Sequence, residues 1–281
     1  MFLIFGTPRS GTTLLAQCLS AHPQLIVPDE THFIVPAAFV FDRIADVAVR
    51  REILKPLITK SRRTAASLGE FLDEATICDI IDRHSDSLAS LLCAIYDAIA
   101  EKAGALQAGD KTPNDMGFLG ILIQARGIPD DAKIVHIVRD PRDVLSSLRE
   151  RRWNANPEKL FPRTWNNSNL NLHAQFHSSR RYRLVRYEDL VRSPLKELAR
   201  LCIFLGVSCD FLLRMIDQRE RHARYHGQAH HARLYEPISD AAIGRFRTSL
   251  PGDMIAACER QAAEAMAVFG YDRSTERTME G

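Results

Sequence analysis

Hydrophobic residues occur in this chain as short continuous runs and as longer segments with helical spacing. The runs at 2–5 (FLIF), 133–138 (KIVHIV) and 182–187 (YRLVRY) are typical of buried strands. From residue 33 to about 105, apolar residues recur at i, i+3 and i+4, which predicts a mainly helical segment. Strands that alternate with helices favour an α/β fold with a parallel sheet.

The pattern predicts a single domain over residues 1–281, since the chain has no internal repeat and no flexible Gly/Ser linker. The helical segment at about 33–105 is expected to be an insertion packed on the sheet. Asp140 is predicted to cap a helix that begins at the following proline. We expect a long polar loop over 218–239 and a final helix over 251–269.

Composition and charge exclude several classes of protein. Hydrophobic residues make up 46% of the chain and charged residues 26%, which is enough for a core and excludes a disordered chain. The net charge of +2 is small for a nucleic-acid binder, so no nucleic acid is expected as a partner. No apolar run approaches 18 residues, so no membrane insertion is expected.

The ends of the chain and its cysteines indicate a compartment. The first residues, MFLIFG, lack the basic region and cleavage site of a signal peptide. The six cysteines are scattered, form no CxxC pair, and in several cases lie within apolar helical patterns. Reduced, buried thiols are therefore predicted, in a cytoplasmic protein without a metal site.

The segment from Gly6 to Thr13 (GTPRSGTT) has the context of a phosphate-binding loop, because it follows a strand and opens a helix. Backbone N–H groups and the helix N-terminus converge on an anion in such a loop. The lysine of the nucleoside-triphosphate pattern is replaced by Thr12, and Arg9 supplies the cation instead. The loop thus suits a terminal oxyanion better than ATP·Mg, and the fold is predicted as a P-loop-type parallel sheet flanked by helices. Its candidate anion-binding residues are Arg9, Ser10, Gly11, Thr12 and Thr13.

A second candidate anion site follows the strand at 133–138. Arg139 lies at the carboxyl end of that strand, where ligands of open α/β sheets bind. Ser147 and Arg151 lie four residues apart on the next helix and share a face, so the three side chains could converge on one dianion. The alternative is an arginine that pairs with Asp140 or Asp143. Two anion sites in one chain suggest a nucleotide with phosphates at two positions.

These motifs together resemble the sulfotransferase family that uses 3′-phosphoadenosine 5′-phosphosulfate (PAPS). In that family a PRSGTT-like loop holds the 5′-phosphosulfate, and an Arg and a Ser eight residues later hold the 3′-phosphate. The resemblance is closest to the tyrosylprotein sulfotransferase branch. It rests on PRSGTTLL, AHP, Asp29-Glu30-Thr31, the D-K-T-P segment, V-x-Y-E-x-L at 185–190 and a late G-R-F.

The resemblance implies a role for each matching residue. Glu30 matches the base that takes the acceptor proton, and Lys111 matches the lysine that stabilises the bridging oxygen. Arg9 would bind the sulfuryl or 5′-phosphate oxygens. Tyr187 matches a tyrosine near the nucleotide, and Arg245 matches a basic residue on the cofactor.

Several alternatives stay open at this point. His32 competes with Glu30 as base, since imidazole titrates near neutral pH. His230 occupies the position at which the tyrosylprotein branch has a serine that assists the transition state, and its role here is open. A metal site among the loop histidines is disfavoured, because Gly227 interrupts the helical spacing of His222, His226, His230 and His231. Three aromatic residues either line an acceptor pocket or belong to the core: Trp153, Phe161 and Trp165.

The predicted function is in-line transfer of a sulfuryl group from PAPS to a hydroxyl or amine, without a metal. The acceptor is expected to be a small molecule, a sugar or a peptide. The tyrosylprotein enzymes are membrane-anchored and disulfide-bonded, so their protein-tyrosine substrate is not carried over to this chain. Two alternatives are a P-loop small-molecule kinase and a non-catalytic nucleotide-binding protein with the same fold.

Overall fold

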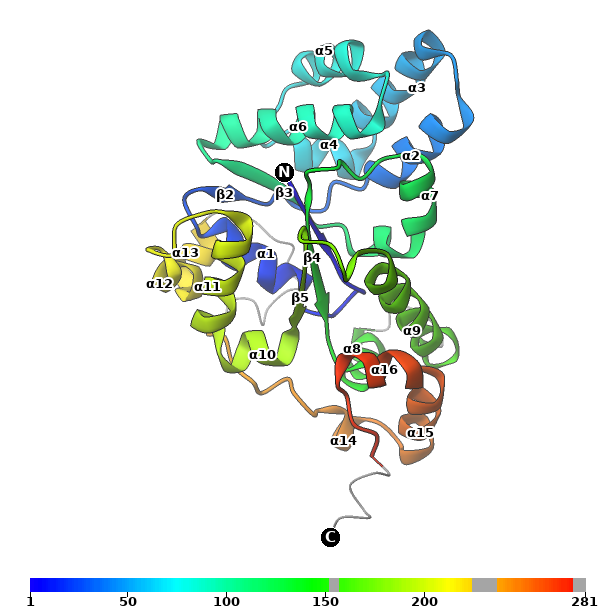
Figure 1. Ribbon diagram of the computed structural model, residues 1–281, viewed down its shortest axis with the longest axis vertical. Coiled ribbons are helices and arrows are strands. Elements are labelled where there is room, and N and C mark those ends of the chain that lie inside the picture. Colours follow the sequence, from blue (N-terminus) through cyan, green and yellow to red (C-terminus); the bar gives the residue numbers. More distant parts are fainter. Residues whose placement is uncertain (152–156, 224–236, 275–281) are drawn as a thin grey trace.

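A computed structural model describes residues 1–151, 157–223 and 237–274 of the protein (Figure 1). Within these residues, one five-stranded sheet has the order β2-β3-β1-β4-β5, and all neighbouring strands are parallel. The strands are β1 (Phe2–Phe5), β2 (Leu25–Ile26), β3 (Gln107–Asp110), β4 (Lys133–Val138) and β5 (Tyr182–Arg186).

Helices connect every pair of successive strands. Helix α1 (Thr12–Ser20) follows β1. Between β2 and β3 lie α2 (Ile34–Arg43), α3 (Val47–Thr59), α4 (Arg62–Leu68), α5 (Glu74–His84) and α6 (Leu88–Ala103). The 3-10 helix η1 (Pro113–Phe118) and α7 (Leu119–Gln124) precede β4, which is followed by α8 (Pro141–Arg151) and α9 (Pro157–Phe176). After β5 come α10 (Tyr187–Arg192), α11 (Pro194–Leu205), α12 (Leu212–Ile216), α13 (Gln218–Ala223), α14 (Phe246–Ser249), α15 (Gly252–Gln261) and α16 (Ala263–Phe269).

The strands face a hydrophobic core on both sides of the sheet. Phe2 and Ile4 of β1 pack in a cluster with residues of α1 and α11. The alternating residues Leu3 and Phe5 pack in another cluster with the helical segment α2–α6. Side chains alternate across a strand, so a strand covered on both faces reads as a continuous apolar run. This confirms the prediction of a parallel sheet flanked by helices, and Figure 1 shows α2–α6 gathered at one end of the molecule.

Strand β3 was not predicted from the sequence. Its residues, QAGD, have low strand propensity, yet β3 pairs with both β1 and β2. A Cβ atom at Gly109 would lie 2.2 Å from the ring of Phe2, so the neighbouring strand requires glycine there. The requirement comes from a residue more than a hundred positions away and leaves no local pattern.

Two predictions for the C-terminal third were wrong in part. The predicted loop at 218–239 begins with helix α13, because Asp217 caps it by accepting from the N–H groups of Arg219 and Glu220. The predicted helix at 251–269 is divided at Ala262, since α15 and α16 pack in two different hydrophobic clusters. The capping role predicted for Asp140 is confirmed by the N–H of Arg142, which donates to its Oδ1 at 2.9 Å.

All six cysteines are free thiols. Burial raises the pKa of three of them, Cys18, Cys202 and Cys258, to about 12, so these thiols are chemically inert. Cys78 and Cys93 are only partly buried and Cys209 is exposed, so the prediction of buried thiols holds for three of the six. In the described ranges, no helix is both long enough and apolar enough to cross a membrane.

A buried histidine makes the stability of the fold depend on pH. His136 of β4 is fully buried between the Tyr182 hydroxyl (2.7 Å) and Oδ1 of Asn169 (2.8 Å), and burial lowers its pKa to about 4. A histidine with a lowered folded-state pKa contributes stability above its unfolded pKa, near 6.5, and this contribution is lost as the pH falls toward 4.

We therefore predict that the stability advantage of the wild type over His136→Gln shrinks by about 2 kcal/mol between pH 7 and pH 5. Denaturant unfolding at a series of pH values measures the difference. His177→Gln, at an exposed position, is the control. A difference between wild type and His136→Gln that stays constant across this range would contradict the assignment.

Candidate functional site

Each strand delivers a candidate residue to the same edge of the sheet. The loop that begins at Gly6 follows β1, Lys111 follows β3, Arg139 follows β4 and Tyr187 follows β5. Glu30 lies four residues after β2. Because the strands are parallel, their carboxyl ends meet at one edge, where the crevice of an open α/β sheet forms.

The loop between β1 and α1 has the backbone of an anion site. Gly11 precedes α1 with a φ of 94°, and a Cβ atom there would lie 2.5 Å from the Tyr187 ring. Arg9 also has a positive φ, 70°, which is uncommon for a residue other than glycine and occurs at ligand-binding positions. The fully buried Ser10 bonds the Thr7 hydroxyl at 2.7 Å. The N–H groups of the first turn of α1, at Thr12 and Thr13, point out of the helix as in other anion-binding helices.

The two predicted anion sites are joined through Arg9. Its Nε donates to Oγ of Ser147 at 3.1 Å, across 138 positions of the sequence. Its backbone carbonyl accepts from Nη1 of Arg139 at 3.1 Å. The guanidinium of Arg139 also lies 4.5 Å above the ring of Tyr187. The structure thus brings together Arg9, Arg139, Ser147 and Tyr187.

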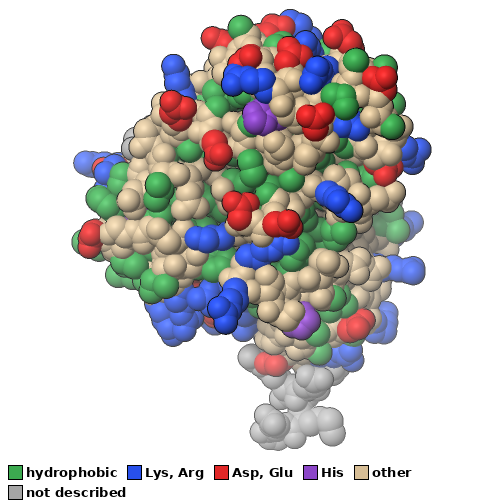
Figure 2. Space-filling view, turned by 45° about the horizontal axis from the view of Figure 1, so that its top comes forward, with side chains coloured by type: hydrophobic (Ala, Val, Ile, Leu, Met, Phe, Trp, Pro, Cys, Tyr) green, Lys and Arg blue, Asp and Glu red, His purple; other side chains and the backbone are tan. Residues whose placement is uncertain are grey.

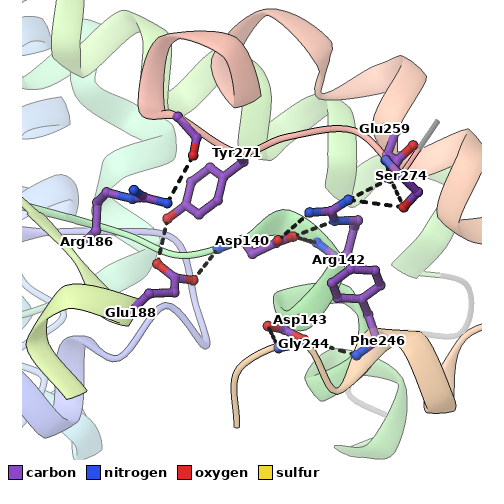
Figure 3. Close-up of polar contacts among 11 residues, drawn as sticks. Asp140, Arg142, Asp143, Arg186, Glu188, Gly244, Phe246, Glu259, Tyr271 and Ser274 are labelled. Carbon is purple, nitrogen blue, oxygen red and sulfur yellow. Dashed lines mark hydrogen bonds and ion pairs between the residues drawn. The ribbon is translucent and has the colours of Figure 1, made fainter. Parts of the chain in front are cut away.

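Arg139 and Arg142 begin the same segment but have opposite surroundings. Arg142 is held by Asp140 and Glu259, each at 2.6 Å, so two carboxylates compensate its charge (Figure 3). Arg139 instead donates to the carbonyls of Arg9 and Ala242, and its buried Nε has no hydrogen-bond partner among the described residues. Among the described residues Arg139 forms no ion pair with Asp140 or Asp143, although burial raises the pKa of Asp143 and the charge of Arg139 lowers it. Arg139 retains a charge and a donor for an anion.

Asp143 holds the segment that contains Arg245. Its carboxylate accepts from the N–H groups of Gly244 (2.7 Å) and Phe246 (3.0 Å), and Figure 3 shows both contacts. Arg245 lies between these two residues, and its side chain pairs with Glu150 at the end of α8, at 2.5 Å. The pair is partly exposed.

A further network in Figure 3 fixes the loop after β4. Glu188 accepts from the N–H of Asp140 at 3.0 Å and from the hydroxyl of Tyr271 at 2.9 Å. Burial raises the pKa values of both Glu188 and Tyr271. The chain after α16 is thereby tied to the loop of Arg139.

The carboxylate and the ammonium predicted for catalysis form an ion pair. Nζ of Lys111 lies 2.9 Å from Oε1 of Glu30 and 3.9 Å from Oδ1 of Asp29. Lys111 is 1% exposed, whereas the Glu30 side chain is 29% exposed and therefore reachable from solvent. His32, the competing base, lies 3.5 Å from the other Glu30 oxygen, and its φ is 56°. The three groups form one cluster.

Behind this cluster lies a buried polar network that sequence analysis missed. Asp110 accepts from the hydroxyls of Tyr96 (2.5 Å) and Thr31 (2.8 Å), and burial raises its pKa. Asp115 of η1 is also buried, and burial together with the charges of Asp110 and Glu30 raises its pKa to about 8. The sequence could have indicated Asp110, because it directly precedes the candidate Lys111. It could not have indicated Tyr96, which lies in a helical segment without a recognisable motif.

Some candidates lie elsewhere. Trp165 is fully buried in a core cluster, and Phe161 packs against the same cluster, so these rings belong to the core. The side chain of Arg151 lies outside the described part of the structure. The same holds for Trp153, His226, His230 and His231. Among the described residues, no group of three or more His, Cys, Asp or Glu side chains could hold a metal ion.

Comparison with known proteins identifies the family. The sequence model of the Sulfotransferase family matches residues 2–210. Carbohydrate sulfotransferase 1 of Rattus norvegicus is 28% identical over 166 residues, which are 51% of this chain and 39% of the rat protein. Protein-tyrosine sulfotransferase of Drosophila melanogaster is 24% identical over 287 residues, which are 97% of this chain and 52% of the fly protein. The chain thus spans only part of the length of these relatives.

Solved structures support the same assignment. The sulfotransferase domain of the Synechococcus PCC 7002 olefin synthase aligns with a TM-score of 0.65 and 26% identity, over 97% of this chain and 94% of that domain. A sulfotransferase domain from the curacin biosynthetic pathway shares the fold, with a TM-score of 0.61 at 21% identity, over 94% of this chain and 96% of that domain. Since the family match extends over well more than half of the 281 residues, the chain belongs to the sulfotransferase family.

Proposed function

We propose that this protein transfers a sulfuryl group from PAPS to a hydroxyl or amine of its acceptor. The observation that carries the proposal is the meeting, at one sheet edge, of two linked anion-binding segments and a buried lysine paired with an accessible carboxylate. Family membership supports the reaction class. It disfavours the kinase alternative, as does Thr12 in place of the phosphate-binding lysine.

The residues of the site fit a nucleotide with two separate anionic groups. The loop from Arg9 to Thr13 and the N-terminus of α1 suit the 5′-phosphosulfate. Arg139 and Ser147 suit the 3′-phosphate, because Arg139 has an unpartnered buried Nε and is contacted mainly by carbonyls and a ring. Arginine binds phosphate through several N–H groups at once, so a dianion would accept hydrogen bonds from Arg139 and compensate its charge.

We assign distinct roles to the paired residues, and their different exposure supports the assignment. Glu30, from its accessible position, accepts the proton of the acceptor hydroxyl as the new oxygen–sulfur bond forms. Lys111 and Arg9 neutralise the charge that develops on the bridging oxygen and the sulfuryl oxygens as the sulfur–oxygen bond to the nucleotide breaks. Their fixed positions also keep attacking and leaving oxygens in line.

The class of acceptor is a finer proposal. Similarity to both carbohydrate and protein-tyrosine sulfotransferases supports a sugar or a peptide hydroxyl, and a small-molecule hydroxyl is the third class. The motif resemblance to the tyrosylprotein branch favours Glu30 over His32 as base, whatever the acceptor. On the face drawn in Figure 2, basic side chains are interspersed with acidic ones over much of the surface, which supports a small partner over a polyanion. Mass spectrometry for the gain of one SO₃ would identify the acceptor.

The structure also supports the predictions of a single domain and of a cytoplasmic location. The cluster that joins Leu3 and Phe5 to helices α2–α6 supports a single domain with the helical segment packed on the sheet. Six free thiols support a reducing, cytoplasmic location.

We predict that adenosine 3′,5′-bisphosphate raises the thermal midpoint of the protein and that ATP·Mg does so much less, since only a ligand of the native state stabilises it. Arg139→Ala should remove most of the advantage of the bisphosphate over adenosine 5′-monophosphate. Arg83→Ala, in an exposed pair on α5, is the control and should behave as wild type. Stabilisation by ATP·Mg alone would rule out the proposed cosubstrate.

We further predict that Glu30→Gln lowers kcat by roughly 10²- to 10⁴-fold, the range of general-base contributions, while the bisphosphate still binds. Lys111→Met should lower kcat as well, because the charge on the leaving oxygen loses its counterion. Glu74→Gln, in an exposed pair with Lys60, is the matched control. Steady-state rates and bisphosphate titration measure both effects. A non-catalytic nucleotide-binding protein would have no turnover to lose.

A further inference from the structure

The segments after β2 and β3 are cross-linked at two consecutive positions. Glu30 pairs with Lys111 at 2.9 Å, and the next residue, Thr31, donates to the residue before Lys111, Asp110, at 2.8 Å. The first link is partly exposed, whereas Thr31 is fully buried and Asp110 is 4% exposed. The catalytic pair therefore has a buried polar link directly beneath it.

A third element enters this inner link from the helical segment. Tyr96 of α6 is fully buried, and its hydroxyl lies 2.5 Å from Oδ1 of Asp110 and 3.2 Å from Oγ1 of Thr31. Its ring stacks on Phe33 with 6.5 Å between the centroids. One carboxylate oxygen thus receives hydroxyls from α6 and from the segment of Glu30.

The outer pair alone does not fix the two backbone segments that carry it. Its lysine is buried but its carboxylate is 29% exposed, and Glu and Lys side chains have many rotamers, so the head groups can meet over a range of backbone positions. A buried network whose loss leaves a carboxylate without its donors is much more costly to break. The inner link therefore constrains the two backbone segments that carry Glu30 and Lys111.

We propose that Tyr96, Thr31 and Asp110 are positioning residues that hold Glu30 and Lys111 in register for sulfuryl transfer. The proposal rests on the proposed function for its catalytic consequence. It also gives the helical segment α2–α6 a functional role, because Tyr96 of α6 contacts the buried carboxylate next to Lys111. None of the three groups touches the reacting atoms.

The first test separates positioning from binding. Tyr96→Phe removes only a hydroxyl, and Thr31→Val removes another while it keeps the side-chain shape. Each should lower kcat by roughly tenfold to a hundredfold, the effect of a small misplacement of catalytic groups, while KM for PAPS and the Kd of adenosine bisphosphate stay unchanged. Thr31→Ser, which restores the hydroxyl, should retain most of the wild-type kcat.

A matched control accounts for general loss of stability. Tyr182 is a partly buried tyrosine whose hydroxyl bonds His136 and His173, away from the site. Tyr182→Phe should reduce the thermal midpoint as Tyr96→Phe does, but leave kcat at the wild-type value. A drop in kcat for both tyrosine variants alike would overturn the positioning role.

The second test does not depend on activity. Lys111 is 1% exposed, so reductive methylation followed by mass spectrometry should label it slowly, with the exposed Lys60 as internal reference. Labelling of Lys111 should become several-fold faster in Tyr96→Phe and Thr31→Val, and stay slow in Thr31→Ser and Tyr182→Phe. Unchanged labelling in the first two variants would overturn the proposal. Faster labelling in a protein that shows no sulfuryl transfer would support the network and refute the proposed function instead.

Discussion

The all-parallel arrangement of the sheet is the constraint on which the rest of this structure depends. Parallel strands need long crossover connections, so helices cover both faces and the strands become buried apolar runs. The carboxyl edge is where successive connections depart from the sheet. Polar residues that follow the strands therefore converge there, although Glu30 and Tyr187 are far apart in the sequence.

Individual arginines of this nearly neutral protein differ in whether nearby carboxylates compensate their charge. Arg142 is neutralised by Asp140 and Glu259 and serves the architecture. Arg139 is three residues away, and neutral carbonyls orient it without cancelling its charge. Whether an arginine is compensated by nearby carboxylates matters more for anion binding than the net charge of +2, which sums over both types of arginine.

The helical segment between β2 and β3 contacts both the core and the candidate site. Its helices share a hydrophobic cluster with the sheet residues Leu3 and Phe5. Through Tyr96 it also reaches the buried carboxylate next to Lys111. Packing and polar contacts of one segment therefore stabilise the fold and shape the site together.

Glu30 and Lys111 became candidates only through their match to family motifs. By itself, the sequence determined strands β1, β4 and β5, the loop after β1 and the position of Arg139 at a strand end. These features have local signals, because apolar runs, a strand–loop–helix context and a strand-end cation are all readable within a few residues. Only the tertiary structure decided the rest. It inserted QAGD as a central strand against Phe2, joined Arg9 to Ser147, placed Trp165 in the core and brought Tyr96 to Asp110. Each of these depends on residues distant in the chain, and contacts of that kind leave no periodicity or spacing in the sequence around either partner.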